Sequence, residues 1–500
     1  MKNEWNDLLN PLTVKELRQN VNSNAVKFGG VILALGLAYG VMTLFSWSQS
    51  GIDFIKESDL KSTGATIFVI GTYALALGCL GFGGVLGMFR FARERSVPDL
   101  DVGNFIAMSP LRMAWGHLLT SLVMCLYVYG ICLPSVVCAY YLQGRTLGSM
   151  MLSQIYVMVL VLALNIAMIW VGSTGRYGYC VFMILIGFVV GSALLAPYTI
   201  LLWGQEFSSP TLLSMEVVGL LLGGMFFMFT IAELSAPLSN RLLPVRIYSF
   251  VASIVSLLFG IFLQNRNMDE SILVSQWTCL GASLIFALIV TLYGLTGPMK
   301  VSIRVREKCP NNPITRFVFF LFSSVWGGGY LLSVAMISVI FLVVKMCQPD
   351  LWSSDLLIPV ANMVGYMIFY VATFFGLMNF CKRQNSGTLA SVVVIVFNVV
   401  PFLIWIANLL LVNRSLDHGG QFVGKSWNIL MSFSILRYIP EMFEGMLFLN
   451  WKDYAANLIG IWLGGLSTLV LLPIIVKQFI GFHKPTDDEW KELLTPQKKL

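Results

Sequence analysis

The residues that most directly suggest chemistry begin at position 418, where the sequence reads HGGQFVGKSW. The pattern G-x-x-x-x-G-K-S, which binds nucleotide phosphates, is matched by Gly419, Gly424, Lys425 and Ser426. A working phosphate loop joins a buried strand to a helix in a soluble α/β domain that also supplies a metal-binding acid. Here the match follows an apolar run and lies in a segment, 413–453, too short for a nucleotide-binding domain. We interpret 419–426 as a chance match and expect no enzymatic activity in this chain.

Metal and thiol chemistry are not indicated by the cysteines and histidines. The nine cysteines are scattered without a C-x-x-C pair, and the three histidines, His117, His418 and His483, lie far apart in the sequence. These spacings predict neither a disulfide framework nor a zinc site. We therefore expect no metal and no cofactor.

The composition is that of a membrane protein. Of the 500 residues, 57% are hydrophobic and 11% charged, and the mean hydropathy is +0.79; soluble domains have about 25% charged residues. Apolar runs long enough to cross a bilayer recur along the whole chain. They predict an all-α polytopic protein with about twelve spans, at 28–47, 65–89, 113–141, 150–172, 178–202, 213–233, 248–264, 273–295, 326–344, 357–381, 389–412 and 455–476. The polar first residues contain no short apolar core, so we expect no cleavable signal peptide.

The basic residues predict the orientation of the chain. With a cytoplasmic N-terminus and twelve spans, most of the 32 Lys and Arg residues fall in cytoplasmic segments. We therefore expect both termini, including the charged tail, on the cytoplasmic side of a cell inner membrane. The net charge of +7 is explained by basic loops facing anionic lipid head groups and requires no nucleic-acid partner.

The lengths of the connections predict two six-helix halves, 1–247 and 248–500. The longest cytoplasmic connections, 90–112 and 296–324, are the second and the eighth, so they occupy the same place in two successive sets of six spans. The apolar but broken stretch 426–451, before the last span, is interpreted as an outer re-entrant segment.

A short interfacial helix is expected before the first span. Asn10 is suited to cap it and Pro11 to occupy its first turn. Trp5, Leu8, Leu9, Leu12 and Leu17 form an apolar side, and we expect Lys15, Glu16, Arg18 and Gln19 to face water along the inner membrane surface. An ordinary polar lead-in to the first span is the alternative.

Two stretches resemble bacterial ABC type-2 permeases. NPLTVKELRQNVNS (10–23) resembles their opening, with Asn-Pro before a charged helix, and RERSVPDLDVGNFIAMSPLRMAWGHLL (93–119) resembles their signature after the second span. ELSAPLSNRLLPVR (233–246) and FSILRYIPEMFEG (433–445) are similar to further segments of such permeases. His117 stands where the family usually has lysine.

This resemblance implies the membrane subunit of an ATP-driven exporter, with ATP hydrolysed on a separate cytoplasmic ATPase subunit. Residues that match the family's coupling segment are Arg93, Glu94, Arg95, Asp101 and Arg112, and those that match its interfacial helix are Glu16 and Arg18. Arg304 and Arg306 occupy the corresponding loop of the second half. Membrane lipids are further partners, and pairing with a second permease or a second copy of this chain is left open.

Two other functions remain open at this point. A degenerate permease that only anchors or assembles partners would keep the same spans. A secondary carrier is disfavoured, because the predicted spans contain only two acidic residues, Glu216 and Glu233, each near a span end.

Overall fold

The structure is a computed structural model that describes residues 11–49, 57–96, 109–141, 147–175, 210–235, 240–264, 270–294, 303–347, 361, 364, 365, 368, 369 and 459–483. Within these ranges the regular structure is helical throughout. The chain forms two compact units, one of residues 1–237 and 258–279 and the other of residues 238–257 and 280–500.

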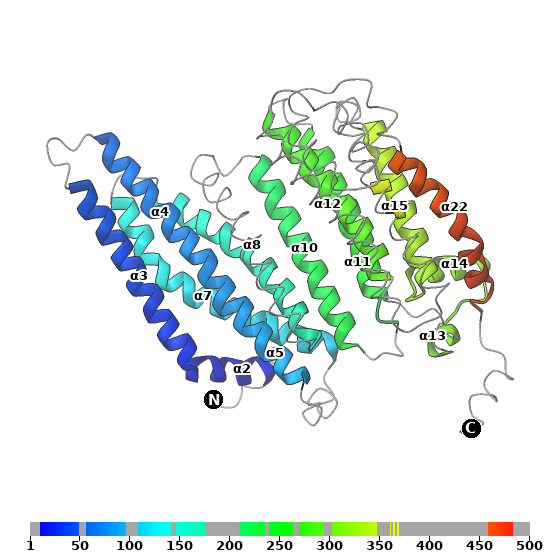
Figure 1. The fold of residues 1–500 in the computed structure, drawn as a ribbon, viewed down its shortest axis with the longest axis horizontal. Helices are drawn as coiled ribbons and strands as arrows, with labels where there is room; N and C mark the ends of the chain where they lie inside the picture. Colours follow the sequence, from blue (N-terminus) through cyan, green and yellow to red (C-terminus); the bar gives the residue numbers. More distant parts are fainter. Residues whose placement is uncertain are drawn as a thin grey trace, which may run out of the picture. The chain divides into compact units, whose positions relative to one another are not determined.

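The first unit begins with a short helix followed by long ones (Figure 1). Its helices are α2 (Pro11–Asn22), α3 (Asn24–Gln49), α4 (Glu57–Cys79), the π-helix η1 (Leu80–Val85), α5 (Leu86–Ser96), α7 (Pro110–Tyr141), α8 (Leu147–Ser173) and α10 (Pro210–Leu234). The segments α4, η1 and α5 follow one another without a break. The predicted helix at the N-terminus is therefore confirmed, and it starts at Pro11 as expected, because proline suits the first helical turn.

The second unit contains α13 (Ile303–Glu307), α14 (Pro313–Phe322), α15 (Trp326–Cys347) and α22 (Ile459–Ile480). Two helices contribute residues to both units: α11 (Leu243–Gln264) and α12 (Glu270–Gly294). The connection expected at 296–324 thus contains two short helices, and that expected at 90–112 is shorter, because α5 continues to Ser96 and α7 starts at Pro110.

Seven of the described helices are long and apolar enough to cross a membrane, which indicates a membrane-embedded protein. These spans are Asn24–Thr43, Gly64–Arg95, Pro110–Tyr141, Met150–Ser173, Leu213–Leu234, Leu243–Leu263 and Trp326–Cys347, and each overlaps a predicted one. The spans expected at 273–295 and 455–476 overlap shorter apolar helices, Thr278–Val290 and Gly464–Ile480. Those expected at 178–202 and 389–412, and the re-entrant segment at 426–451, lie outside the described residues, and of that expected at 357–381 only residues 361, 364, 365, 368 and 369 are described. The twelve-span layout therefore stays a prediction.

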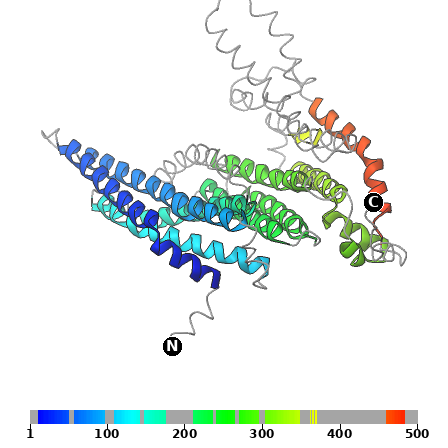
Figure 2. The same ribbon diagram turned by 60° about the horizontal axis from the view of Figure 1, so that its bottom comes forward.

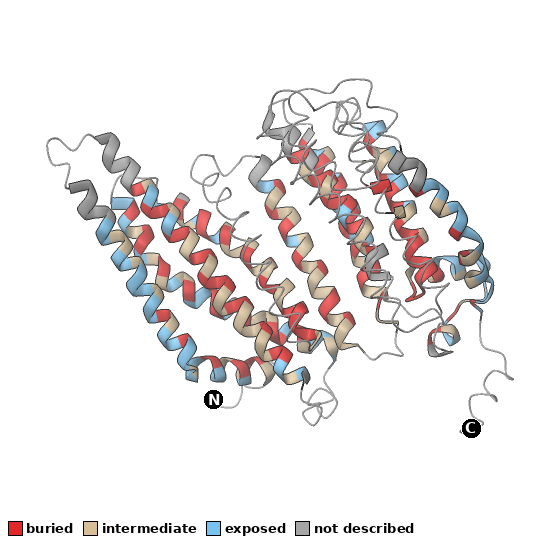
Figure 3. Cartoon of the chain, in the orientation of Figure 1, coloured by how far each residue is buried: buried red, intermediate tan, exposed pale blue. Residues whose placement is uncertain are grey.

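Apolar side chains are exposed on the outer surfaces of these helices (Figure 3). On α3, for example, Ile32 is 69% and Tyr39 72% exposed. Exposed apolar side chains in a regular helical face are expected where lipid, rather than water, surrounds the protein.

In the first unit, α8 packs against α10, α4, α5 and α7. The α8–α10 crossing is close at Gly223, where an added Cβ would lie 2.8 Å from the Cβ of Ala163. Small residues at such a crossing let helix backbones approach closely.

The π-helix η1 is stabilised by a polar side chain of α8. Asn165 is buried, and its Nδ2 donates to the carbonyl O of Cys79, which directly precedes η1, at 3.1 Å. Gly84 leaves room for this amide, because an added Cβ would lie 2.5 Å from Asn165 Oδ1. A π-helical segment needs local partners of this kind for the backbone groups that its change of register releases.

The second unit has a buried arginine at the break between α14 and α15. Arg246 on α11 is 1% exposed. Its guanidinium donates to three backbone carbonyls, those of Leu321 (3.1 Å), Ser323 and Val325 (2.9 Å). The carbonyl groups at the end of α14 therefore have a charged donor, which is favourable because the C-terminal end of a helix is the negative end of its dipole.

Candidate functional site

The candidate site lies in the first unit, where α2 meets the end of α5 and the start of α7. After α2 the chain bends at Ser23, whose N–H donates to the carbonyl of Asn20 at 3.0 Å. Helix α2 runs crosswise to α3, and it packs against α7 (Figure 1, Figure 2). The described parts of the two stretches with the resemblance, 11–23 in the first and 93–96 and 109–119 in the second, are thereby brought together.

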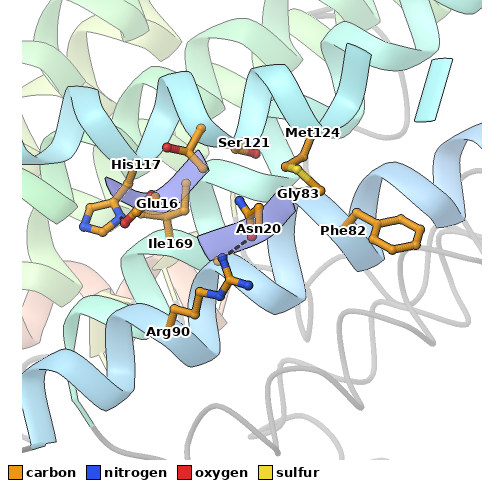
Figure 4. Close-up of a pocket in the computed structure, with 11 residues that line it drawn as sticks. Glu16, Asn20, Phe82, Gly83, Arg90, His117, Ser121, Met124 and Ile169 are labelled. Atoms are coloured by element: carbon orange, nitrogen blue, oxygen red, sulfur yellow. Dashed lines mark hydrogen bonds and ion pairs between the residues drawn. The ribbon is translucent and has the colours of Figure 1, made fainter. Parts of the chain in front are cut away.

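A buried ion pair joins these stretches. Glu16 Oε1 lies 2.5 Å from His117 Nδ1, and the two side chains are 8% and 4% exposed. The ring of Phe91 stacks on the imidazole, with centroids 4.0 Å apart and planes inclined by 30°. The expectation that Glu16 faces water is therefore wrong: Glu16 is turned into the protein, where His117 compensates its charge (Figure 4).

The buried stripe of α2 is polar, and its exposed residues include the charged Lys15 and Arg18. Thr13, Glu16 and Asn20 are 2%, 6% and 4% exposed when the whole residue is counted. Their spacing of three and four residues places them in one stripe of the helix. Thr13 donates to the carbonyl of Gly116 at 3.3 Å, and Asn20 accepts a hydrogen bond from Arg90. The α2–α7 contact is thus made by polar groups.

The surroundings of Glu16 keep it ionised. Burial by itself raises the pKa of this carboxyl. The charge of His117 and its hydrogen bond, together with a hydrogen bond from Thr120 and the charge of Arg90, outweigh burial and hold the pKa of Glu16 below its ordinary value.

A second ion pair lies at the surface. Lys15 Nζ is 2.8 Å from Glu94 Oε1, and the side chains are 45% and 35% exposed. An exposed pair of this kind contributes only about 0–1 kcal/mol. It marks where α2 lies against the end of α5 but adds little to stability.

Arg95 connects the end of α5 to two further helices. Its Nε donates to the carbonyl of Ser173 at 3.3 Å, and its Nη2 to the carbonyl of Glu233 at 3.0 Å. These carbonyls end α8 and α10, where a cation is favourable to the helix dipoles. Arg95 thus links the helix ends of this unit to one another.

The remaining predicted site residues are placed as follows. Arg18, Arg93 and Arg112 are exposed, on α2, on α5 and at the start of α7. Arg304 and Arg306 lie on α13 in the second unit, and Asp101 lies outside the described residues. Sequence reasoning did not name Asn20 on α2 or Arg90 on α5, and it gave Lys15 no role beyond facing water. The polar stripe on α2 was a signal for Asn20 alone.

A small, partly open cavity of about 10 Å³, room for about one water molecule, adjoins the ion pair (Figure 4). Its polar lining consists of Glu16, Asn20, Arg90, His117, Thr120 and Ser121. The Nε2 atom of His117 is buried and has no hydrogen-bond partner among the residues that the structure describes.

Three ligating side chains meet at this site, because donor atoms of Glu16, Glu94 and His117 lie within 4.8 Å of one another. Lys15 already neutralises Glu94, however, and the charge of Arg90 acts on Glu16. These cations oppose a metal ion electrostatically, so the arrangement suits an anchoring contact better than metal binding.

Comparisons with protein-family models, with curated proteins and with solved structures find no match to this chain. The stretch 419–426 lies outside the described residues, and its interpretation as a chance match stays a prediction.

Proposed function

We propose that this chain is the membrane-spanning permease subunit of an ATP-driven exporter in a cell inner membrane, and that a separate cytoplasmic ATPase subunit supplies the energy. The observation that supports this proposal most directly is the contact of α2 with α5 and α7, which contain parts of the two stretches that resemble ABC type-2 permeases. Ion pairs from adjacent residues of α2, Lys15–Glu94 and Glu16–His117, join it to α5 and α7. The expected cytoplasmic termini and the two six-helix halves belong to the same proposal.

The proposed docking surface consists of exposed cations on three helix ends. Arg18 on α2, Arg93 on α5 and Arg112 on α7 are exposed. Such side chains suit an acidic groove on a partner, because charge complementarity accelerates association and fixes its orientation.

The ion pairs and hydrogen bonds provide a route for movement from that surface into the spans. A displacement of α2 would act on α7 through the buried Glu16–His117 pair, which is costly to break. A displacement of the end of α5 would act on α8 and α10 through Arg95. In this proposal the partner therefore moves several spans together.

Co-purification from the native membrane under gentle conditions tests the proposal. An ATPase subunit should accompany the wild-type chain and be lost from the double variant Arg18→Glu, Arg93→Glu. The control is Lys345→Glu, which makes the same charge reversal as each single substitution at an exposed residue that the expected topology places on the outer side. Substitutions at Glu94 and Arg95 are avoided, because these residues hold helix ends together.

The outcomes separate the two permease hypotheses. Loss of the ATPase from the double variant alone supports the coupling surface. If no ATPase accompanies any variant, the exporter hypothesis is wrong, and a degenerate permease that anchors other partners becomes the better explanation.

A further inference from the structure

The N-terminal helix pair has a counterpart in the second unit. Asn10-Pro11-Leu12-Thr13 and Asn312-Pro313-Ile314-Thr315 share the pattern Asn-Pro-(Leu/Ile)-Thr. In each case the proline starts a short helix, α2 of 12 residues or α14 of 10 residues. The long apolar helix that follows starts at the thirteenth residue after the proline in both, at Asn24 and at Trp326.

The second copy shows how the pattern forms its helix. The side-chain oxygen of Asn312 accepts from the backbone N–H of Ile314 at 3.1 Å, and Pro313 occupies the first turn. Thr315 Oγ1 donates to the Asn312 carbonyl at 3.1 Å. The shared residues of the second copy are therefore those that start the helix, and in both copies the proline occupies the first helical position.

The end of α14 is also fixed. The N–H of Ser323 donates to the carbonyls of Phe319 (2.9 Å) and Phe320 (3.3 Å), and Ser323 itself is extended. Ser324 donates its N–H to Asn240 Oδ1 at 2.7 Å. Only residues 323–325 separate α14 from α15, so α14 is held at the level where the span formed by α15 begins.

The two short helices differ in what they expose. Helix α2 exposes Lys15, Arg18 and Gln19. Helix α14 buries Phe320 and leaves Ile314, Phe317 and Val318 exposed by 73%, 42% and 48%. These three residues, at relative positions 1, 4 and 5, form one stripe, which we call the α14 stripe.

We propose that α14 is a second interfacial helix. Its α14 stripe inserts into the bilayer at the boundary between the acyl chains and anionic lipid head groups. An apolar stripe at the level where a span begins is suited to the boundary between acyl chains and head groups. The surrounding charge is complementary to such lipids: between residues 300 and 316 there are five basic residues, Lys300, Arg304, Arg306, Lys308 and Arg316, and one acidic residue, Glu307.

The proposal has one consequence for the predicted site residues: Arg304 and Arg306 contact lipid head groups rather than an ATPase. The sequence predicts eight spans between α2 and α14, an even number, so both short helices lie on the same side of the membrane. The proposal does not rest on the energy source of the protein.

Spin labelling in nanodiscs with anionic lipid tests the α14 stripe. The full-length background carries serine at Cys138 and Cys347, which are exposed, and at Cys180 and Cys381. Single nitroxide labels are placed at Ile314→Cys and Phe317→Cys. The matched controls are Thr315→Cys, on another side of the same helix, and Gln19→Cys on α2.

The measurement compares collision rates of each label with oxygen, which concentrates in the bilayer, and with a water-soluble nickel complex. Oxygen collisions should exceed nickel collisions at positions 314 and 317, and nickel should exceed oxygen at positions 315 and 19. Replacing anionic with zwitterionic lipid should reduce the oxygen excess at 314, because the cations then lose their attraction.

Two results would overturn the proposal. A nickel excess at 314 and 317 would mean that the α14 stripe faces water. Low rates with both reagents at these positions would mean that protein covers it. Correct assembly of each variant is checked by its elution as a single species and by an unchanged nickel excess at position 19.

Discussion

The Glu16–His117 pair allows a quantitative test of how α2 is held. When His117 is protonated, the pair consists of two unit charges, which at about 4 Å attract by about 4 kcal/mol at an effective dielectric constant near 20. Both side chains are less than a tenth exposed, so water does not replace the lost partner. Removing one member of such a buried pair typically costs about 3–5 kcal/mol. We expect His117→Ala to lower the free energy of unfolding by about 3 kcal/mol.

The same substitution should reverse the effect of pH on stability. In the wild-type protein the pKa of Glu16 lies below its ordinary value of 4.5. The ionised group therefore stabilises the fold above pH 4.5, and this contribution is lost as pH falls through the depressed pKa. Without His117, burial is the largest influence on Glu16 and is opposed only by Thr120 and Arg90. The pKa should then rise above 4.5, so stability should decrease as pH increases through the raised pKa.

Unfolding by sodium dodecyl sulfate in mixed micelles, followed by intrinsic fluorescence between about pH 2 and pH 8, measures both effects. The control is Lys15→Ala, which breaks a half-exposed pair and should cost less than about 1 kcal/mol. The reasoning is refuted if His117→Ala and Lys15→Ala differ by less than about 0.5 kcal/mol. It is also refuted if the two proteins show the same dependence on pH.

Three further substitutions test other parts of the structure. Arg246→Met leaves the carbonyls at the end of α14 without their charged donor and should lower the unfolding free energy by about 3 kcal/mol, measured in the same titration. Gly84→Ala places a Cβ 2.5 Å from Asn165 Oδ1, so it should destabilise by about 1–3 kcal/mol. Gly87→Ala, with nothing within 4 Å, should be neutral or stabilising, and equal effects would contradict the packing argument. Lys425→Ala should leave binding of a fluorescent ATP analogue by the purified chain unchanged, and a loss of binding would mean that the phosphate-loop match is functional.

The sequence predicts some of these features because their causes are local. Asn-Pro before a charged segment is sufficient to place the start of α2 at Pro11, and long apolar runs are sufficient to locate spans. The π-helix η1 was not predictable in this way. Its glycines are ordinary in a membrane helix. The side chain that donates to the carbonyl before η1, Asn165, comes from another helix and lies 86 residues from Cys79 in the sequence.

The burial of Glu16 shows a different limit. A helical pattern separates the polar side of α2 from its apolar side, but it does not reveal which side faces the protein. Sequence reasoning placed Lys15, Glu16, Arg18 and Gln19 together on the water-facing side of an interfacial helix; Lys15, Arg18 and Gln19 are exposed, whereas Glu16 is buried. Next to a membrane, apolar side chains are accommodated by lipid, so a polar stripe can pack inward if partners neutralise it. That condition depends on His117 and Arg90, which lie far from α2 in the sequence.

The buried carboxylate also bears on the hypothesis of a proton-driven carrier. The sequence argument against such a carrier relied on the scarcity of acidic residues in the spans, whereas Glu16 reaches a buried position from a helix outside them. A group that binds and releases protons during transport needs a pKa near the working pH. The pKa of Glu16 is instead held below 4.5 by His117, Thr120 and Arg90, so this carboxylate stays ionised at neutral pH. Its constant charge suits a fixed contact between α2 and α7, and the carrier hypothesis gains no support from it.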